Sequence, residues 1–127
     1  MTYSIAEAAE RTGLTPDTLR YYERDGLMVR PVVRSSSGHR RYSDDDLDWI
    51  VMITRLRATG MPIRDVRRYS ELVREGDGNE ETRLELLRAH RDQVLADLAA
   101  VQAHLDAINL KIGVYEERLA PSAELSA

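Results

Sequence analysis

Cysteine is absent from the 127-residue chain, which excludes disulfide bonds, thiolate metal sites and thiol redox switching. The three histidines are scattered and form a poor set of metal ligands. Long apolar runs are also missing, since no stretch approaches the roughly 18 residues that cross a bilayer. The N-terminus lacks the basic stretch followed by an apolar one that marks a secretory signal. We therefore expect a cytoplasmic protein that uses neither a cofactor nor a membrane.

Positive charge is scarce overall, because 22 acidic residues outnumber 18 basic ones and leave a formal net charge of −4. That balance is unusual for a nucleic-acid binder, which neutralises phosphates with clustered Lys and Arg. The charges are unevenly distributed, however. Residues 1–70 hold 12 Arg against 10 acids, whereas residues 71–127 hold 6 basic and 12 acidic residues. The sequence thus joins a basic N-terminal part to an acidic C-terminal part.

Two short helices are predicted near the N-terminus. Ser4 and Glu7 have the spacing of a capping box, so a helix should follow through about residue 11. Gly13 breaks that helix, and Thr15 with the proline after it forms a typical start for a second one over residues 16–25. Two helices joined by a short turn containing a glycine are typical of a helix-turn-helix.

A change of character over residues 27–42 predicts a β-hairpin. The stretch LMVRPVVRSSSGHRRY has β-branched residues on both sides of a Ser-Ser-Ser-Gly turn. We interpret it as the wing of a winged helix-turn-helix. Two further helices should follow, one capped by Ser43 and running to about residue 59, and one from residue 62 or 63 to about residue 74. The winged helix-turn-helix DNA-binding domain is therefore expected over residues 1–75.

One long helix is predicted over residues 80–119, which contain no Pro and a single Gly. Its apolar positions alternate in steps of three and four over about five heptads, with one Arg as the only break. A stripe this narrow is more often a helix-pairing site than one face of a globular core. Residues 120–127 are expected to be a flexible tail. The predicted dimerisation positions are Leu84, Leu87, Arg91, Val94, Leu98, Val101, Leu105, Ile108, Ile112, Tyr115 and Leu119.

Two sequence strings, together with the order of the predicted elements, are specific enough to point to a protein family. The strings TLRYYERDGL at residues 18–27 and GHRRY at residues 38–42 are followed by a capped helix, TGMPI and the long heptad helix. This arrangement resembles the mercury-resistance regulator (MerR) family of bacterial transcription factors over essentially the whole chain. The short tail resembles members that carry little beyond the dimerisation helix. The implied fold class is mainly α, with a winged helix-turn-helix head and a long C-terminal helix that forms an antiparallel coiled coil.

The resemblance implies a homodimer that binds an inverted-repeat promoter in double-stranded DNA and distorts a spacer that is too long. RNA polymerase at that promoter would be a further partner. The chain departs from the family's metal-, thiol- and redox-sensing members, which use cysteines that are missing here. Those effectors are therefore excluded, while an organic ligand and a regulator without any ligand both stay open.

The candidate DNA-binding residues lie on the second helix, on the wing and beside the later turn. Thr15 and Thr18 occupy the first turn of the recognition helix, where base contacts are usual, although Thr15 can also simply cap the helix. Tyr21 is expected to face DNA and Tyr22 to pack inward, because adjacent residues cannot share a helix face. The full set is Thr15, Thr18, Arg20, Tyr21, Arg34, His39, Arg40, Arg41, Arg57 and Arg64.

The arginines of this set have alternatives that the sequence leaves open. Arg20 can donate a bidentate pair to a base or phosphate, or can bridge Glu23 three residues on. Arg40 and Arg41 are expected at the wing tip with no carboxylate nearby, where they contact phosphate or form a solvated basic loop. Arg57 and Arg64 flank a glycine turn and could contact phosphate; for them a purely structural place is nearly as plausible.

Two other functions compete with transcription regulation. A phage-type excisionase or architectural protein can bend DNA with the same winged helix, but generally lacks a long dimer helix. A coiled-coil scaffold that has lost DNA binding would not need the arginines of helix and wing. No nucleophile with a base and an orienting group stands at a recognisable spacing, so we do not expect an enzyme.

Overall fold

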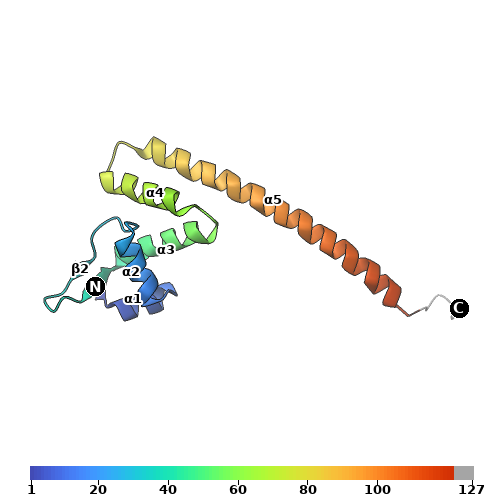
Figure 1. Cartoon of the computed structure of the whole chain (residues 1–127), viewed down its shortest axis with the longest axis horizontal. Coiled ribbons are helices and arrows are strands. Elements are labelled where there is room, and N and C mark those ends of the chain that lie inside the picture. The colour runs from blue at the N-terminus through green and yellow to red at the C-terminus, as the bar shows by residue number, and fades with distance from the viewer. Residues whose placement is uncertain (122–127) are drawn as a thin grey trace. The chain divides into compact units, whose positions relative to one another are not determined.

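The computed structural model describes residues 1–121, which form two compact units, one over residues 1–90 and one beginning at Arg91. The first unit, called the head below, contains three short strands and four helices, followed by the first turns of a fifth helix (Figure 1). The elements are β1 Thr2–Tyr3, α1 Ile5–Thr12, α2 Pro16–Arg24, β2 Val33–Arg34, β3 Arg40–Ser43, α3 Asp44–Ala58, α4 Ile63–Glu75 and α5 Glu80–Leu119.

Helices α1 and α2 form the predicted helix-turn-helix. The capping box of α1 is present, with the Ser4 hydroxyl accepting from the Glu7 amide and the Glu7 carboxylate accepting from the Ser4 amide. Gly13 ends α1 with a φ of 73°, a left-handed conformation that side chains other than glycine disfavour. Thr15 then caps α2, whose first residue is Pro16. Local sequence signals therefore set both boundaries of the turn.

The strands form an antiparallel three-stranded sheet in the order β1-β3-β2. In β3, Tyr42 pairs with Tyr3 of β1 and Arg40 pairs with Arg34 of β2. Strand β1 was not predicted, because two residues are too short to display an alternating pattern. The hairpin expected over residues 27–42 is wrong in its first half, since the strand begins only at Val33.

Residues 27–32 form a buried connection in place of that strand. Leu27, Met28 and Val32 are each at most 6% exposed and belong to the hydrophobic core. The carbonyl of Leu27 accepts side-chain hydrogen bonds from Trp49 and Ser70, which satisfy it without a strand partner. The apolar, β-branched residues of this segment therefore reflect burial in the core and not the strand pairing that was predicted.

The core of the head lies between α1, α2, α3 and α4 and is closed by the sheet. Tyr22 and Tyr42 are its largest fully buried side chains, so the predicted inward packing of Tyr22 is confirmed. Ser43 begins α3 with a second capping box through Asp46. The core residues are Tyr3, Ala8, Ala9, Leu19, Tyr22, Leu27, Met28, Val32, Tyr42, Ile50, Ile53, Leu56, Met61 and Val66.

Helix α5 has the bounds predicted from the sequence, Glu80 to Leu119. Its first turns belong to the head, where Leu86 and Leu87 pack against the core and His90 Nε2 lies 2.8 Å from the hydroxyl of Thr59. No residue of α5 is fully buried. The predicted tail over residues 120–127 falls, from residue 122 on, outside the described residues. Within residues 1–121 no helix has the length and apolar character needed to cross a bilayer.

Candidate nucleic-acid interface

The first turn of α2 presents two threonines. The hydroxyl of Thr15 accepts from the amide of Thr18 at 3.1 Å, and the two hydroxyl oxygens lie 3.0 Å apart. Thr15 is exposed and Thr18 is partly exposed. Capping thus accounts for one lone pair of the Thr15 oxygen, and both side chains remain reachable at the start of the helix.

Arg20 lies one turn further along α2 and is exposed. Its Nη1 donates to the carboxylate of Asp17 at 2.8 Å, and not to Glu23, the alternative partner that the sequence left open. An exposed ion pair of this kind is worth little and exchanges readily for another acceptor. Arg20 is therefore held on the surface of α2 without being committed to a buried partner.

The two adjacent tyrosines of α2 face different ways. Tyr22 is 1% exposed and its hydroxyl lies 3.0 Å from that of Thr54 in α3. Tyr21 is only partly buried, and the guanidinium groups of Arg57 and Arg24 lie 5.4 Å and 5.9 Å from its ring centre. Arg57 of α3 is thereby brought beside the recognition helix through aromatic contacts.

Arg64 is not drawn into the same cluster. Its side chain is 82% exposed, and its Nε lies 3.9 Å from the carboxylate of its neighbour Asp65. His39 lies in the turn of the wing, where Nδ1 is 3.0 Å from the hydroxyl of Ser37. Both residues are accessible at the surface, Arg64 at the start of α4 and His39 just before β3.

The predicted position of Arg40 and Arg41 at the wing tip is wrong. Arg40 and Arg41 lie within strand β3 and not at the tip, which is the turn over residues 35–39. Arg40 also has a carboxylate partner, because its Nε donates to Glu23 Oε2 at 2.5 Å. The sequence could not show this pair, since the two residues are 17 positions apart and meet only when the sheet packs against α2.

Neighbouring side chains of β3 point to opposite faces of the sheet. Arg40 shares its face with buried Tyr42 and is directed toward α2. Arg41 lies on the other face, where its guanidinium donates to the hydroxyl and carbonyl of Thr2. The two arginines, which the sequence treats as equivalent, therefore have different surroundings.

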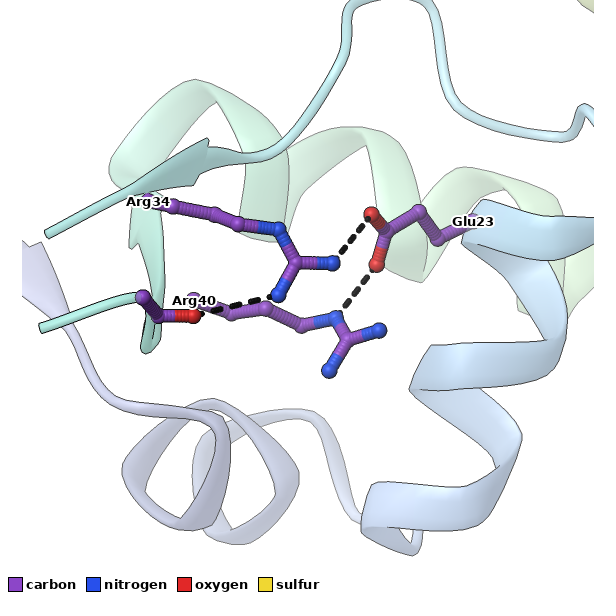
Figure 2. Close-up of polar contacts among 4 residues, drawn as sticks. Glu23, Arg34 and Arg40 are labelled. Carbon is purple, nitrogen blue, oxygen red and sulfur yellow. Dashed lines mark hydrogen bonds and ion pairs between the residues drawn. The ribbon is translucent and has the colours of Figure 1, made fainter.

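Glu23 joins the recognition helix to both strands of the wing (Figure 2). Besides Arg40, it binds Arg34, whose Nη2 lies 3.4 Å from Glu23 Oε1. Arg34 also donates from Nη1 to the carbonyl of Gly38 in the turn, at 3.2 Å. A single carboxylate thus ties α2 to β2 and β3, and sequence reasoning placed it only as a possible partner of Arg20.

The end of α2 is held by α4, a feature that sequence analysis missed. Arg67 donates to the carbonyl and carboxylate of Asp25, at 3.1 Å and 2.7 Å. Arg74 donates to the carbonyl of Gly26 at 3.0 Å, and Ser70 to that of Leu27 at 3.1 Å. These three polar residues of α4 are spaced three and four apart, which places them on one helix face and is the signal that could have revealed them. They satisfy backbone carbonyls of the three residues that follow α2.

The pKa of the Asp25 carboxyl is lowered by this arrangement. The hydrogen bond from Arg67 is the main cause, partial burial opposes it, and Tyr21 and the nearby arginines lower the pKa further. The carboxylate therefore stays ionised and keeps its bond to Arg67. The recognition helix is fixed at its C-terminal end by α4 and at its side by the wing.

Two open hollows lie beside α2. One, of about 370 Å³, is lined by Arg20, Glu23, Arg24 and Arg40. The other, of about 190 Å³, lies between α1, α2 and the wing and is lined by Ser4, Ile5, Arg20, Gly38, His39 and Arg40. Arg20 and Arg40 line both, so the surface between recognition helix and wing is predominantly cationic. Among the described residues no three His, Asp or Glu side chains are grouped in a way that could hold a metal ion.

The apolar positions of α5 are largely uncovered in the single chain. Leu98, Val101 and Ile108 are 56–62% exposed, and Leu119 is 84% exposed. Leu84, Leu105, Ile112 and Tyr115 are 45–52% exposed. Of the predicted dimerisation positions, only Leu87 and Val94 are partly buried, and Leu87 packs on the head. Arg91 contacts the carboxylate of its neighbour Asp92 at 3.2 Å.

Family models match both halves of the chain. The MerR HTH family regulatory protein model matches residues 3–72, and the MerR DNA-binding model matches residues 47–110. The chain belongs to the MerR family. The resemblance drawn from the two sequence strings is confirmed, as is the mainly helical fold with a helix-turn-helix and a long C-terminal helix.

Individual MerR-family proteins are similar over nearly the whole chain. An uncharacterized HTH-type transcriptional regulator from Haemophilus influenzae is 36% identical over 92% of this chain and 86% of its own length. The crystal structure of HiNmlR, a MerR family regulator lacking the sensor domain, bound to promoter DNA, matches with a TM-score of 0.83 at 36% identity, over 92% of both chains. A MerR family transcriptional regulator from Bacillus thuringiensis matches with a TM-score of 0.79 at 31% identity, over 91% of this chain and all of the other.

Proposed function

We propose that this MerR-family protein is a transcription regulator that binds an inverted-repeat promoter element in double-stranded DNA as a homodimer and distorts it. The observation that carries the proposal is the cationic surface between α2 and the wing, where Arg20, Arg24 and Arg40 gather around one carboxylate. The similarity to a family member bound to promoter DNA supports the same partner. The protein would act in the cytoplasm, with RNA polymerase as a second partner at the promoter.

The recognition helix and the wing would contribute different contacts. Thr15, Thr18 and Arg20 lie on the N-terminal turns of α2, the part of a recognition helix that contacts base edges. Arg34, Arg40 and Arg41 of the wing are suited to phosphates, which position a protein without reading sequence. Arg57, Arg64, Tyr21 and His39 would add contacts at the edges of this surface.

Pairing through α5 would present two recognition helices related by a two-fold axis. An inverted repeat has the same symmetry, so each head would meet one half-site. The exposed apolar positions of α5 support this pairing, because a helix with so much uncovered Leu, Ile and Val gains stability from a partner. A second copy of the same chain is the partner that the family suggests.

The binding experiment compares fluorescent duplexes carrying an inverted repeat from the upstream region, one half-site, a direct repeat and random sequence. We expect the inverted repeat to bind about 100-fold more tightly than the half-site, since linking two binding events raises avidity by about 10² to 10⁴. Equal binding of the direct repeat or random duplexes would exclude sequence-specific regulation. Transcription in vitro with purified polymerase then separates a regulator from an excisionase-like protein that only bends DNA.

Two arginine substitutions divide the proposed contacts into classes. Arg20→Ala should relax specificity at one base pair of each half-site, costing about 1 to 3 kcal/mol there. Arg41→Ala should weaken all duplexes about equally and reduce the salt slope by about one for each bound head. Affinities measured at several salt concentrations, on the inverted repeat and on single-base variants, distinguish the two. A wild-type salt slope in Arg41→Ala would remove that residue from the interface.

A further inference from the structure

Glu23 is an acid on the surface expected to meet polyanionic DNA. An uncompensated carboxylate close to phosphate repels it, so removing a negative charge there should by itself strengthen binding. Glu23 lies in the last turn of α2 and lines the same hollow as Arg20, Arg24 and Arg40. Charge alone therefore does not explain why a glutamate lies at this position.

The geometry around Glu23 supplies that reason. Its side chain is only 24% exposed, and each of its two carboxylate oxygens is bound by a different wing arginine. Arg40 uses Nε for this contact, and Figure 2 shows its two terminal nitrogens pointing away from the carboxylate. The guanidinium is therefore fixed at one edge while its other donors are left available.

A held arginine binds an anion more strongly than a free one. An unrestrained arginine loses up to about 2 kcal/mol of side-chain entropy when it is ordered, and a side chain ordered beforehand avoids part of that loss. Arg40 is already restricted, since its side chain is only 23% exposed and lies between α2 and the sheet. The surrounding charges, three arginines against one glutamate, remain favourable to phosphate.

We propose that Glu23 is a positioning residue for DNA binding: it holds Arg40, with Arg34 beside it, so that the terminal nitrogens of Arg40 meet a backbone phosphate in the hollow next to α2. Glu23 itself touches no DNA. This inference rests on the proposed function, because it requires that the surface between α2 and the wing binds a duplex.

The sign of one substitution tests the proposal. Glu23→Gln removes a negative charge yet should weaken binding to specific and random duplexes alike by about 10-fold, and should reduce the salt slope by about one for each bound head as the Arg40 contact is lost. Glu10→Gln is the matched control, since Glu10 is exposed on α1 and no ion pair is found for it within residues 1–121. That control should bind as the wild type does or slightly more tightly.

A second variant covers the case in which Glu23→Gln fails to fold. Arg40→Lys keeps the charge but has a single ammonium group, which cannot be held at one nitrogen while offering others in a fixed plane. We expect it to lose about as much affinity as Glu23→Gln, and the double variant to lose no more than Arg40→Lys alone. Thermal melting of each protein shows that the heads are folded.

Three results decide the matter. Weaker binding with a lower salt slope in Glu23→Gln and Arg40→Lys supports the proposal. Unchanged or tighter binding by folded Glu23→Gln, or wild-type binding by Arg40→Lys, overturns it. A wild-type protein that fails to bind the inverted repeat at all overturns the proposed function instead, so the two failures are distinguishable.

Discussion

The head and the long helix use the same apolar residue types for opposite purposes. In the head, Ile50 and Ile53 are fully buried and belong to one continuous core. In α5 beyond residue 90, Ile108 and Leu98 are 56% and 62% exposed. Burial of apolar area contributes about 25 cal/mol per Å², so the exposed stripe represents stabilisation that the single chain does not realise. The head thus folds around its own core, whereas α5 carries apolar surface that the proposed pairing would cover.

The largest effect should follow from placing charge on the exposed stripe. Leu98→Asp combined with Leu105→Asp sets acids one heptad apart on the predicted pairing face, where burial of charge is costly. We expect a monomer by sedimentation and about a 100-fold or greater loss of affinity for the inverted repeat.

A matched control puts the same charges on another face of the helix. Ala96→Asp with Ala103→Asp has the same seven-residue spacing, at positions that fall outside the apolar stripe. This variant should remain a dimer and bind the inverted repeat. If both double variants dissociate, or neither does, the stripe is not the pairing face.

A smaller effect separates buried from exposed apolar groups by stability. Ile53→Ala removes side-chain atoms from a site that is 0% exposed and should lower the free energy of unfolding by about 2 to 5 kcal/mol. Leu110→Ala, at a position 73% exposed and outside the stripe, should change it by less than about 0.5 kcal/mol. Urea titrations at one protein concentration compare them, and a comparable loss in Leu110→Ala would mean that this residue is covered in solution.

The helices were predicted well because the residues that begin and end a helix act locally. Capping boxes at Ser4 and Ser43 and the left-handed glycine at residue 13 each act within a few residues of the boundary they set. The length of α5 followed from the absence of any breaker between residues 80 and 119. Such features need no knowledge of the tertiary fold.

The candidate interface was less predictable, since its contacts join distant parts of the chain. Glu23 meets Arg40 only through packing of the wing on α2, and Arg67 meets Asp25 across 42 residues. Composition identified the basic region but gave no means to pair its acids and bases. Arg40 and Arg41 looked alike for the same reason, because strand alternation separates them only once the strand is placed.

An acid-dependent effect should be confined to the head. The pKa of Asp25 is lowered in the folded state, chiefly by its hydrogen bond to Arg67. Its contribution to stability is therefore complete above the unfolded pKa, about 3.9, and is lost as the pH falls through the lower folded value. Asp25→Asn should lose less stability than the wild type as the pH falls below about 4. The free energy of unfolding is measured by urea titration at a series of pH values. An equal loss of stability in the two proteins as the pH falls would contradict this role.

The smallest effect concerns the register of the proposed helix pair. An antiparallel register that sets Arg91 opposite Tyr115 of the partner subunit gives the one polar residue of the stripe an aromatic contact. Within one chain, Lys111 and Arg118 already lie 5.9 Å and 5.7 Å from the centre of the Tyr115 ring. The register also brings Arg88 near Glu116 and Asp97 near Lys111. Exposed pairs contribute only about 0.2 to 1 kcal/mol each, so register needs a geometric test and not a stability measurement.

The lack of cysteine makes that test direct, because a single introduced thiol is unique. His104 lies midway between Asp97 and Lys111 along the same edge of α5, so the proposed register brings it against His104 of the partner subunit. His104→Cys should therefore be joined efficiently by a short bismaleimide linker, whereas Arg91→Cys should not. A parallel pair gives the reverse, since equivalent stripe positions then face each other. A shift of one heptad keeps the antiparallel orientation but moves Arg91 opposite Ile108 and separates the two copies of residue 104. Loss of both cross-links in a dimeric protein would therefore refute the register and leave the orientation standing.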